Sequence, residues 1–174
     1  MRSRVRVVSV FLVAVAVGVW SLGTFAAPAG AAKKVKVCGL LTQAQVAAVV
    51  GNANEGPQDA GSFLGDGSCD YLTGGGPGAD VRVIVSSNTK RDGRFTFATK
   101  ARFDKTYGSD ESVTGGGGKL NLYHFDNSSS VAQSAFMLTK GKKAVLVVLT
   151  GDSVDHDNGL ARTKQLAQLL MKKL

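Results

Sequence analysis

Residues 135–150 of this 174-residue chain read AFMLTKGKKAVLVVLT, and this stretch predicts a β-hairpin. Its two arms are Ala135 to Thr139 and Ala144 to Thr150, joined by the turn Lys140-Gly141-Lys142-Lys143. The second arm is apolar at consecutive positions from 145 to 149, which is typical of a buried strand. We therefore expect this hairpin to belong to an antiparallel sheet.

Three more segments have the pattern of strands, and one long segment has the composition of a loop. Ser68 to Leu72 and Lys119 to Phe125 are short and rich in apolar residues, and in Asp80 to Ser87 valines alternate with Arg82. Asn52 to Asp66 is polar and glycine-rich, so we expect a loop there. The glycine-rich runs at 74–78 and 115–118 predict turns. Neither has the pattern of a phosphate-binding loop.

The clearest helix in the sequence begins next to Thr42. Thr42 and Gln45 have the spacing of a capping box, in which each side chain bonds the backbone N–H of the other residue. Leu41 and Val46 have the spacing of a hydrophobic staple, and Gly51 is placed to end the helix. The sequence therefore predicts a short, well-capped helix.

A second helix is predicted near residue 174, and a third in the middle of the chain. Lys172 and Lys173 complement the C-terminal end of the last helix, and we expect Asp157 or Asn158 to cap its start. Arg91 to Thr106 has a partly apolar side and is also predicted to be helical. The leucines that form the apolar face of the last helix are Leu166, Leu169, Leu170 and Leu174.

The order of these segments predicts an α+β fold. It runs helix, two strands, helix, three strands, helix. Such an order is satisfied by an antiparallel sheet of about five strands with helices packed on one face. The sequence has no linker that would divide residues 33–174, so we expect a single domain there.

Residues 1–32 have the three parts of a cleavable secretory signal peptide. Three arginines within the first six residues precede an apolar run from Val7 to Ala27, and Ala29-Gly30-Ala31 supplies the small residues of a cleavage site. We expect cleavage after Ala31 or Ala32. The alternative is an uncleaved anchor, because the apolar run approaches the ~20 residues that span a bilayer. After cleavage no stable transmembrane span is expected.

Removal of the expected signal peptide lowers the net charge, and export favours pairing of the two cysteines. The signal peptide carries three of the 21 basic residues and no acidic one, which leaves 18 basic against 13 acidic residues and a net charge of +5. That charge favours solubility and also contact with anionic surfaces. The two cysteines, Cys38 and Cys69, are expected to form a disulfide, because an even count in an exported chain favours pairing.

The segment from Asp152 to Gly159 is the candidate for metal binding. Asp152, Asp155 and Asp157 lie close to one another in the sequence, and carboxylates bind hard cations such as Ca²⁺. The spacing does not match an EF-hand loop, and a strand-to-helix loop with a capping residue explains the same residues. We expect no metal and no other cofactor.

The chain offers few residues for catalysis or nucleic-acid binding. Its only histidines are His124 and His156, and no serine lies in a nucleophile elbow, so we expect no enzymatic activity. Lys140, Lys142 and Lys143 form a basic hairpin tip that could contact an anionic surface. Nucleic acid is not expected as a partner, because aromatic residues are not interleaved with the basic ones.

The run Cys38-Gly39-Leu40-Leu41-Thr42, a short helix ending in Val-Gly, and Cys69-x-Tyr71 resemble an actinobacterial family of secreted proteins and lipoproteins of unknown function. The hairpin through Lys140-Gly141 and the closing helix at 166–174 agree with that pattern. The resemblance implies export, paired cysteines and no transferable catalytic residue. Many members are lipid-anchored. Here Cys38 follows Lys36-Val37 and is no lipid-attachment site, which favours release into the medium or the wall.

These observations together predict an exported, non-catalytic binding domain. Its partner would be an unknown protein or small ligand of the cell envelope or the medium, and its location extracellular. Two alternatives stay open. One is a secreted enzyme of unrecognised type, and the other is a basic protein associated with the cell wall or another anionic polymer.

Overall fold

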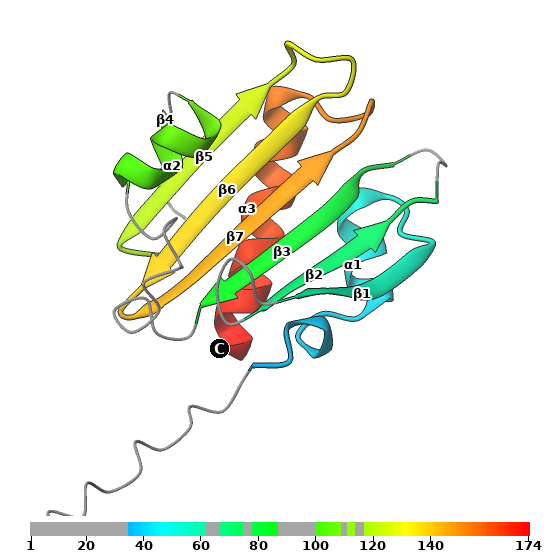
Figure 1. The fold of residues 1–174 in the computed structure, drawn as a ribbon, viewed down its shortest axis with the longest axis horizontal. Coiled ribbons are helices and arrows are strands. Elements are labelled where there is room, and N and C mark those ends of the chain that lie inside the picture. Colours follow the sequence, from blue (N-terminus) through cyan, green and yellow to red (C-terminus); the bar gives the residue numbers. More distant parts are fainter. Residues whose placement is uncertain (1–34, 62–66, 75–77, 87–99, 109–110, 114–116) are drawn as a thin grey trace, which may run out of the picture. The chain divides into compact units, whose positions relative to one another are not determined.

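The computed structural model describes residues 35–61, 67–74, 78–86, 100–108, 111–113 and 117–174 (Figure 1). Most of the predicted elements are present, and apart from the start of α2 their boundaries lie within a few residues of those expected. The elements are η1 (Val37–Gly39), α1 (Gln43–Val50), β1 (Glu55–Gly61), β2 (Gly67–Leu72), β3 (Asp80–Ser86), α2 (Lys100–Tyr107), β4 (Glu111–Ser112), β5 (Leu120–Asp126), β6 (Gln133–Lys140), β7 (Lys143–Thr150) and α3 (His156–Lys173).

One antiparallel sheet carries the fold, which confirms the predicted α+β class. Its strand order is β1-β2-β3-β7-β6-β5-β4. Six strands have six to eight residues each and β4 has two, so the sheet is larger than the expected five strands. The predicted hairpin forms β6 and β7, paired from Lys140 with Lys143 to Gln133 with Thr150. Its buried arm, β7, is the central strand of the sheet.

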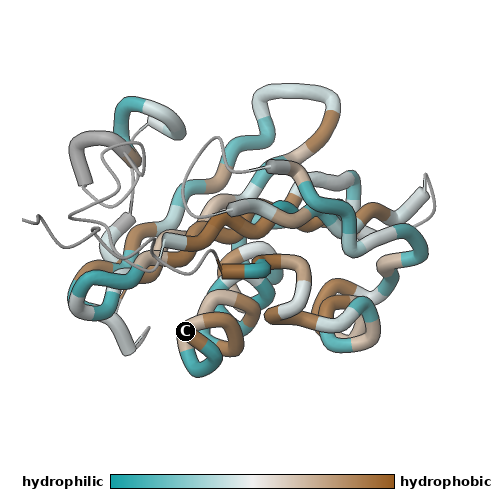
Figure 2. Tube along the Cα trace, turned by 60° about the horizontal axis from the view of Figure 1, so that its bottom comes forward, coloured by the Kyte–Doolittle hydropathy of each residue, from teal (hydrophilic) through white to brown (hydrophobic). Residues whose placement is uncertain are grey.

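Helices α1 and α3 cover one side of the sheet, here called the helical face (Figure 1). Valines and larger apolar residues of β3, β6 and β7 point to this side, because side chains alternate along a strand. Figure 2 shows this apolar layer as brown segments along the strands and helices. The strand residues of the helical face include Cys69, Tyr71, Val81, Val83, Val85, Phe136, Leu138, Val145, Val147 and Leu149.

The remaining helix, α2, packs on the other side of the sheet, here called the opposite face. Its Phe103 is fully buried in a second apolar cluster with Ile84, Leu122, Met137 and Leu146. Two helices therefore lie on the expected face, and α2 does not. The predicted helix at 91–106 is found from residue 100 onward, and residues 87–99 lie outside the described part of the chain.

The prediction of a loop from Asn52 to Asp66 is wrong, because Glu55–Gly61 forms strand β1. This strand has the sequence EGPQDAG and is mostly exposed, so neither its composition nor its periodicity indicates a strand. It pairs with β2 through an irregular register that has two shifts. Pairing with β2, and not its own composition, therefore defines this edge strand. Residues 62–66 lie outside the described part of the chain.

The caps of the two flanking helices follow local rules, but one lies earlier than expected. At α1, Thr42 Oγ1 accepts the Gln45 N–H at 3.2 Å and Gln45 Oε1 accepts the Thr42 N–H at 3.0 Å, which confirms the capping box. At α3 the cap is Asp155, and neither Asp157 nor Asn158 takes that position. The Asp155 carboxylate accepts a hydrogen bond from the Asn158 backbone N–H at 2.8 Å. In return, the Asn158 side-chain oxygen accepts one from the Asp155 backbone N–H at 3.1 Å.

Close contact between α3 and the sheet depends on a glycine. A Cβ added at Gly159 would overlap the hydroxyl of Ser134 and would lie 2.9 Å from the hydroxyl oxygen of Tyr123. That tyrosine donates a hydrogen bond to the His156 carbonyl at 2.7 Å. Its oxygen also lies 3.1 Å from Ser134 Oγ. The first turn of α3 is therefore held against β5 and β6 by a small buried polar cluster.

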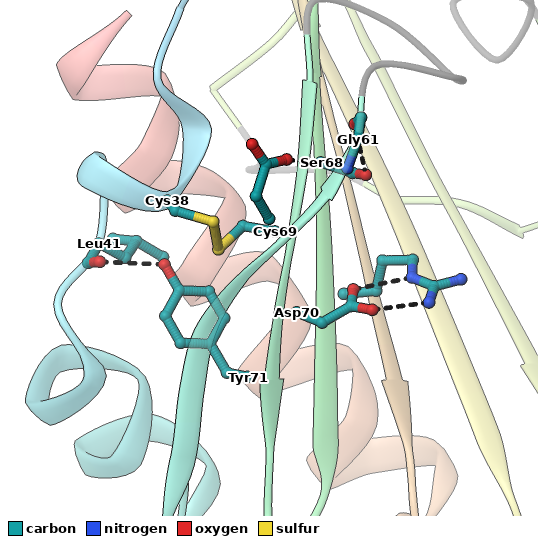
Figure 3. Close-up of a disulfide and its surroundings, with 9 residues drawn as sticks. Cys38, Leu41, Gly61, Ser68, Cys69, Asp70 and Tyr71 are labelled. Carbon is teal, nitrogen blue, oxygen red and sulfur yellow. Dashed lines mark hydrogen bonds and ion pairs between the residues drawn. A yellow bond between two sulfur atoms is a disulfide. The ribbon is translucent and has the colours of Figure 1, made fainter.

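The predicted disulfide between Cys38 and Cys69 is present and joins η1 to β2 (Figure 3). The two Cα atoms are 5.1 Å apart, and 31 residues of sequence separate them. Two residues beyond the bridge, the buried hydroxyl of Tyr71 donates to the Leu41 carbonyl at 2.9 Å. Burial raises the pKa of Tyr71 to about 12. The segment before α1 is thus fastened to β2 at two points.

Candidate functional site

The structure gathers lysines from three chain segments at one end of the sheet. The β6–β7 turn lies at this end, with Gly141 in the left-handed region at φ 61°. Lys119 is adjacent, because its N–H donates to the Thr139 carbonyl at 2.7 Å. The C-terminal turn of α3 returns to the same end, since Lys143 Nζ bonds the Leu174 carbonyl. We call this region the basic end. Besides Lys173, whose Nζ bonds the Leu40 carbonyl, its exposed lysines are Lys119, Lys140, Lys142 and Lys172.

The three lysines of the predicted hairpin tip differ in what they contact. Lys143 is partly buried and bonds Leu174, so it fastens α3 to the hairpin. Lys140 and Lys142 are exposed, and neither forms an ion pair with any residue that the structure describes. Lys173 resembles Lys143 in its role, because its Nζ bonds the Leu40 carbonyl. Sequence reasoning treated the tip lysines as equivalent, and it did not include Lys119 or Lys172.

A hollow of about 280 Å³ lies at the basic end between β6 and α3. Lys140 and Lys172 supply two ammonium groups to its wall, and Leu138 and Met171 supply an apolar part. Gln168 and Gly117 complete the lining. Two cations on one hollow favour a ligand with negative charge, and their position beside a helix C-terminus stabilises them.

The acidic segment from Asp152 to Gly159 serves to start α3. Asp155 is the N-cap of the helix, and its second carboxylate oxygen accepts a hydrogen bond from the Asn158 side-chain amide at 2.5 Å. Asp157 is almost fully exposed and pairs with the neighbouring His156 at 2.9 Å. Asp152 is exposed as well. Among the residues that the structure describes, no group of three or more His, Cys, Asp or Glu side chains is arranged to hold a metal ion.

Both histidines lie against aromatic rings. His124 is in β5, as predicted, and its ring centre is 6.3 Å from that of Tyr107 in α2. The His156 ring meets the rings of Tyr123 and Phe125 edge to face, at centroid distances of 5.4 and 5.9 Å. The imidazole of His156 lies 2.9 Å from the carboxylate of Asp157, and this pair is open to solvent.

A second polar region lies on the opposite face, next to α2. Arg82 of β3 donates two hydrogen bonds to Asp70 of β2, at 2.8 and 2.7 Å. Figure 3 shows Asp70 on the side of β2 away from Cys69 and Tyr71. Burial raises the pKa of Tyr107 in α2 to about 12, and the nearby Arg82 cation opposes that rise. Sequence reasoning singled out neither member of the ion pair, although the alternation around Arg82 placed it on the polar side of its strand.

Comparison with known proteins gives no family for this chain. No protein-family model matches it, and no curated protein and no solved structure is significantly similar to it. Of the helices that the structure describes, none has both the length and the apolar character needed to cross a membrane.

Proposed function

We propose that the chain is an exported, non-catalytic domain that binds an anionic polymer through its basic end. One observation carries the proposal: four exposed lysines from three segments lie at one end of the sheet, and two of them line a hollow there. No described carboxylate neutralises them. Opposite charges about 4 Å apart in water attract by ~1 kcal/mol, so several simultaneous contacts add to a useful affinity.

A soluble or wall-bound polymer fits the basic end better than a lipid bilayer. Peripheral membrane proteins combine basic residues with apolar side chains that enter the interface. Among the described residues, the only large apolar side chain that is exposed is Val131. It lies in the turn between β5 and β6, at the end of these strands away from Lys119 and the β6–β7 turn. The basic end therefore offers charge without an inserting residue.

Export is part of the same proposal and rests on the sequence of residues 1–32 together with the disulfide. Disulfides persist in oxidising compartments, and this one ties down the first described segment. The resemblance to secreted actinobacterial proteins agrees with export. The intact mass of the protein recovered from culture medium tests it. We expect a chain that begins at Ala32 or Lys33 and is lighter by two thiol hydrogens, and an uncleaved mass found only in membranes would contradict export.

Binding to long-chain inorganic polyphosphate tests the role of the basic end. Fluorescence anisotropy with a labelled polymer should show saturable binding at low ionic strength that weakens steadily as NaCl is added, because salt screens exposed charges. Lys140→Glu replaces one attraction by a repulsion. We expect this variant to bind about thirtyfold more weakly, which corresponds to ~2 kcal/mol.

Lys105→Glu is the matched control, because Lys105 is an exposed lysine on α2 and the change in net charge is the same. We expect it to bind polyphosphate nearly as well as the unchanged protein. An equal loss in both variants would mean that only net charge matters. Binding that does not depend on salt would contradict the proposal, and so would tighter binding to phosphatidylglycerol vesicles than to the polymer.

A secreted enzyme is the second candidate, and the pairing of His156 with Asp157 favours it. A carboxylate that orients an imidazole is a part of many hydrolytic sites. The pair is solvent-exposed, whereas such sites exclude water, and this makes it the weaker candidate. If a hydrolytic activity is found, the His124→Ala/His156→Ala variant decides the matter. Unchanged activity would remove both histidines from any mechanism.

A further inference from the structure

The opposite face carries two rows of side chains that cross the sheet near the ends of β3 and β7. The strand register places Asp70 beside Arg82 and Arg82 beside Val148 in the first row. In the second row, Asp80 pairs with Thr150 and Thr150 with Gln133. These residues alternate with the apolar positions of the helical face, so they point to the side that α1 and α3 leave uncovered.

A hollow of about 260 Å³ lies over these rows. Val148 is nearly buried, and its partner on the side away from Arg82 is the small, buried Ala135, so the first row is low beyond Arg82. Leu72 and Val148 form an apolar floor, and polar groups surround it. The lining residues are Asp70, Leu72, Asp80, Val81, Arg82, Gln133, Val148 and Thr150. We call this hollow the open-face pocket.

Several polar groups of the open-face pocket keep free hydrogen-bonding capacity. The side chains of Gln133 and Thr150 make no hydrogen bond with any residue in the described part of the chain. Asp80 uses one oxygen to accept from the Thr73 N–H at 2.8 Å and the Thr73 hydroxyl at 3.0 Å. Its other carboxylate oxygen is available. Together these groups offer both donors and acceptors around the apolar floor.

The chemistry of the lining selects among ligand classes. The two carboxylates outnumber the one guanidinium, so the pocket has a net charge of −1 and disfavours phosphate and other anions. An ammonium group can only donate, and would leave the amide N–H groups of Gln133 without acceptors. A sugar hydroxyl both donates and accepts, and the C–H face of a sugar ring suits the floor of Leu72 and Val148. The size is below the roughly 300–1,000 Å³ of pockets that enclose drug-sized ligands, which suits one sugar ring.

We propose that the open-face pocket binds a neutral sugar unit. Asp80 and Gln133 accept and donate to hydroxyl groups from one side, and the pair of Arg82 with Asp70 bounds the other. This goes beyond the proposed binding of anionic polymer, because it uses the other face of the sheet and an uncharged ligand. Either proposal can fail while the other holds.

Two-dimensional NMR of the labelled protein tests the sugar site directly. The probes are neutral mono- and disaccharides of glucose, mannose, galactose and N-acetylglucosamine, titrated at 0.3 M NaCl to suppress charge-driven contacts. At least one probe should move the amide signals of Arg82, Gln133 and Val148 in a saturable manner. Signals of Lys140 and Lys172 at the basic end should stay in place.

Gln133→Ala should raise the dissociation constant of the same sugar at least tenfold. Its matched control is Gln165→Ala, because Gln165 is exposed on α3, which packs on the helical face and is no part of the pocket lining. Thr150→Val is a second variant of nearly equal shape that removes only the hydroxyl, and it should also weaken binding. Both pocket variants are checked for a native spectrum before titration.

Three outcomes would overturn the sugar site. The first is that no saccharide of the panel shifts any signal at 20 mM probe, an assay concentration ~20-fold above a dissociation constant of order 1 mM. The second is that shifts gather elsewhere on the protein. The third is that Gln133→Ala and Gln165→Ala bind the sugar equally well. Polyphosphate binding measured on the same samples shows whether the basic end is intact, so the two proposals are judged separately.

Discussion

Along β2, consecutive residues meet two different environments. Cys69 and Tyr71 point to the helical face, where one is bridged to Cys38 and the other bonds a buried carbonyl. Asp70 lies between them in the sequence and points to the opposite face, where it holds Arg82 at the surface. The same contrast continues along β3 and β7. On the helical face nearly every position is apolar, whereas the opposite face mixes apolar with polar positions.

This difference separates what holds the fold from what is free to bind. On the helical face two helices and a cross-link bury a continuous apolar layer, so changes there act on stability. On the opposite face α2 packs against β5, and no helix that the structure describes covers the strand ends around Asp80 and Thr150. Changes there should act on ligand binding and leave stability almost unchanged. Four stability measurements test this division.

Removing the cross-link between Cys38 and Cys69 should have the largest effect. A bridge that spans 31 residues stabilises by ~3–4 kcal/mol in the chain-entropy model. We expect Cys38→Ala/Cys69→Ala to lose about this much free energy of unfolding in urea titrations. Reduction with dithiothreitol should reproduce the loss. A decrease below ~1 kcal/mol would mean that the helical face does not depend on this attachment.

Gly159→Ala should follow, at a cost of ~3 kcal/mol, the upper end of ordinary overpacking. Alanine forms helices better than glycine, so helix propensity alone would make this variant more stable. A loss of stability would therefore come from the overlap of the new Cβ with Ser134. Ser134→Gly in the same chain should restore part of the loss, because it removes the overlapped atoms. Ala161→Gly at an exposed position of α3 is the control, with an expected cost of ~1 kcal/mol. A stabilised Gly159→Ala variant would contradict the close packing of α3.

Tyr71→Phe should cost ~1–2 kcal/mol, because the Leu41 carbonyl loses its donor in a buried place. The hydroxyl also makes stability depend on pH. Its pKa is about 12 in the folded protein and ordinarily near 10 in an unfolded chain, so the unfolded state releases its proton first. Stability should therefore fall as the pH rises from about 10 to 12.

Unfolding measured at pH 9 and pH 11.5 checks this sign, and Tyr71→Phe should make the fall less steep. Part of the fall should persist in the variant, because burial raises the pKa of Tyr107 to about 12 as well. The chain has two cysteines and both are in the bridge, so no free thiol starts disulfide exchange at high pH. An unchanged slope in Tyr71→Phe would show that Tyr71 ionises equally in both states.

Asp70→Ala should have the smallest effect, under ~1 kcal/mol. The partner Arg82 has more than half of its side chain exposed, and ion pairs at such sites contribute little. Asp70 and Tyr71 are neighbours in the sequence, so the two variants compare the faces at one place in one strand. If Asp70→Ala lowered the free energy of unfolding as much as Cys38→Ala/Cys69→Ala does, the division into a structural and a binding face would be wrong.

Sequence patterns predicted the elements that local rules determine. The capping box of Thr42 and the hairpin turn at Lys140 depend on residues a few positions apart, and both are confirmed. Strand β1 could not be predicted, because its residues adopt that form only beside β2. The start of α3 was placed too late, because the leucine pattern covers only its second half. The spacing of Asp155 and Asn158 already has the form of a cap and could have located it.

The candidate sites were less accessible from the sequence. The lysines of the hairpin tip were predicted, but their separation into tethered Lys143 and exposed Lys140 depends on where α3 ends. The open-face pocket combines residues from β2, β3, β6 and β7 that lie up to 80 positions apart. Their assembly requires the strand order and the register, and neither can be obtained from periodicity.

The exposed edge strand β1 has a consequence for the behaviour of the protein at high concentration. Flat, regular edges recruit strands from other copies, which leads to aggregation. Here the edge has two shifts of register, a proline at position 57 and acidic residues at 55 and 59. A second chain finds no continuous ladder of hydrogen bonds to extend. This edge should therefore not recruit a strand from a second copy when the protein is concentrated, and a partner that contacts β1 would recognise its side chains.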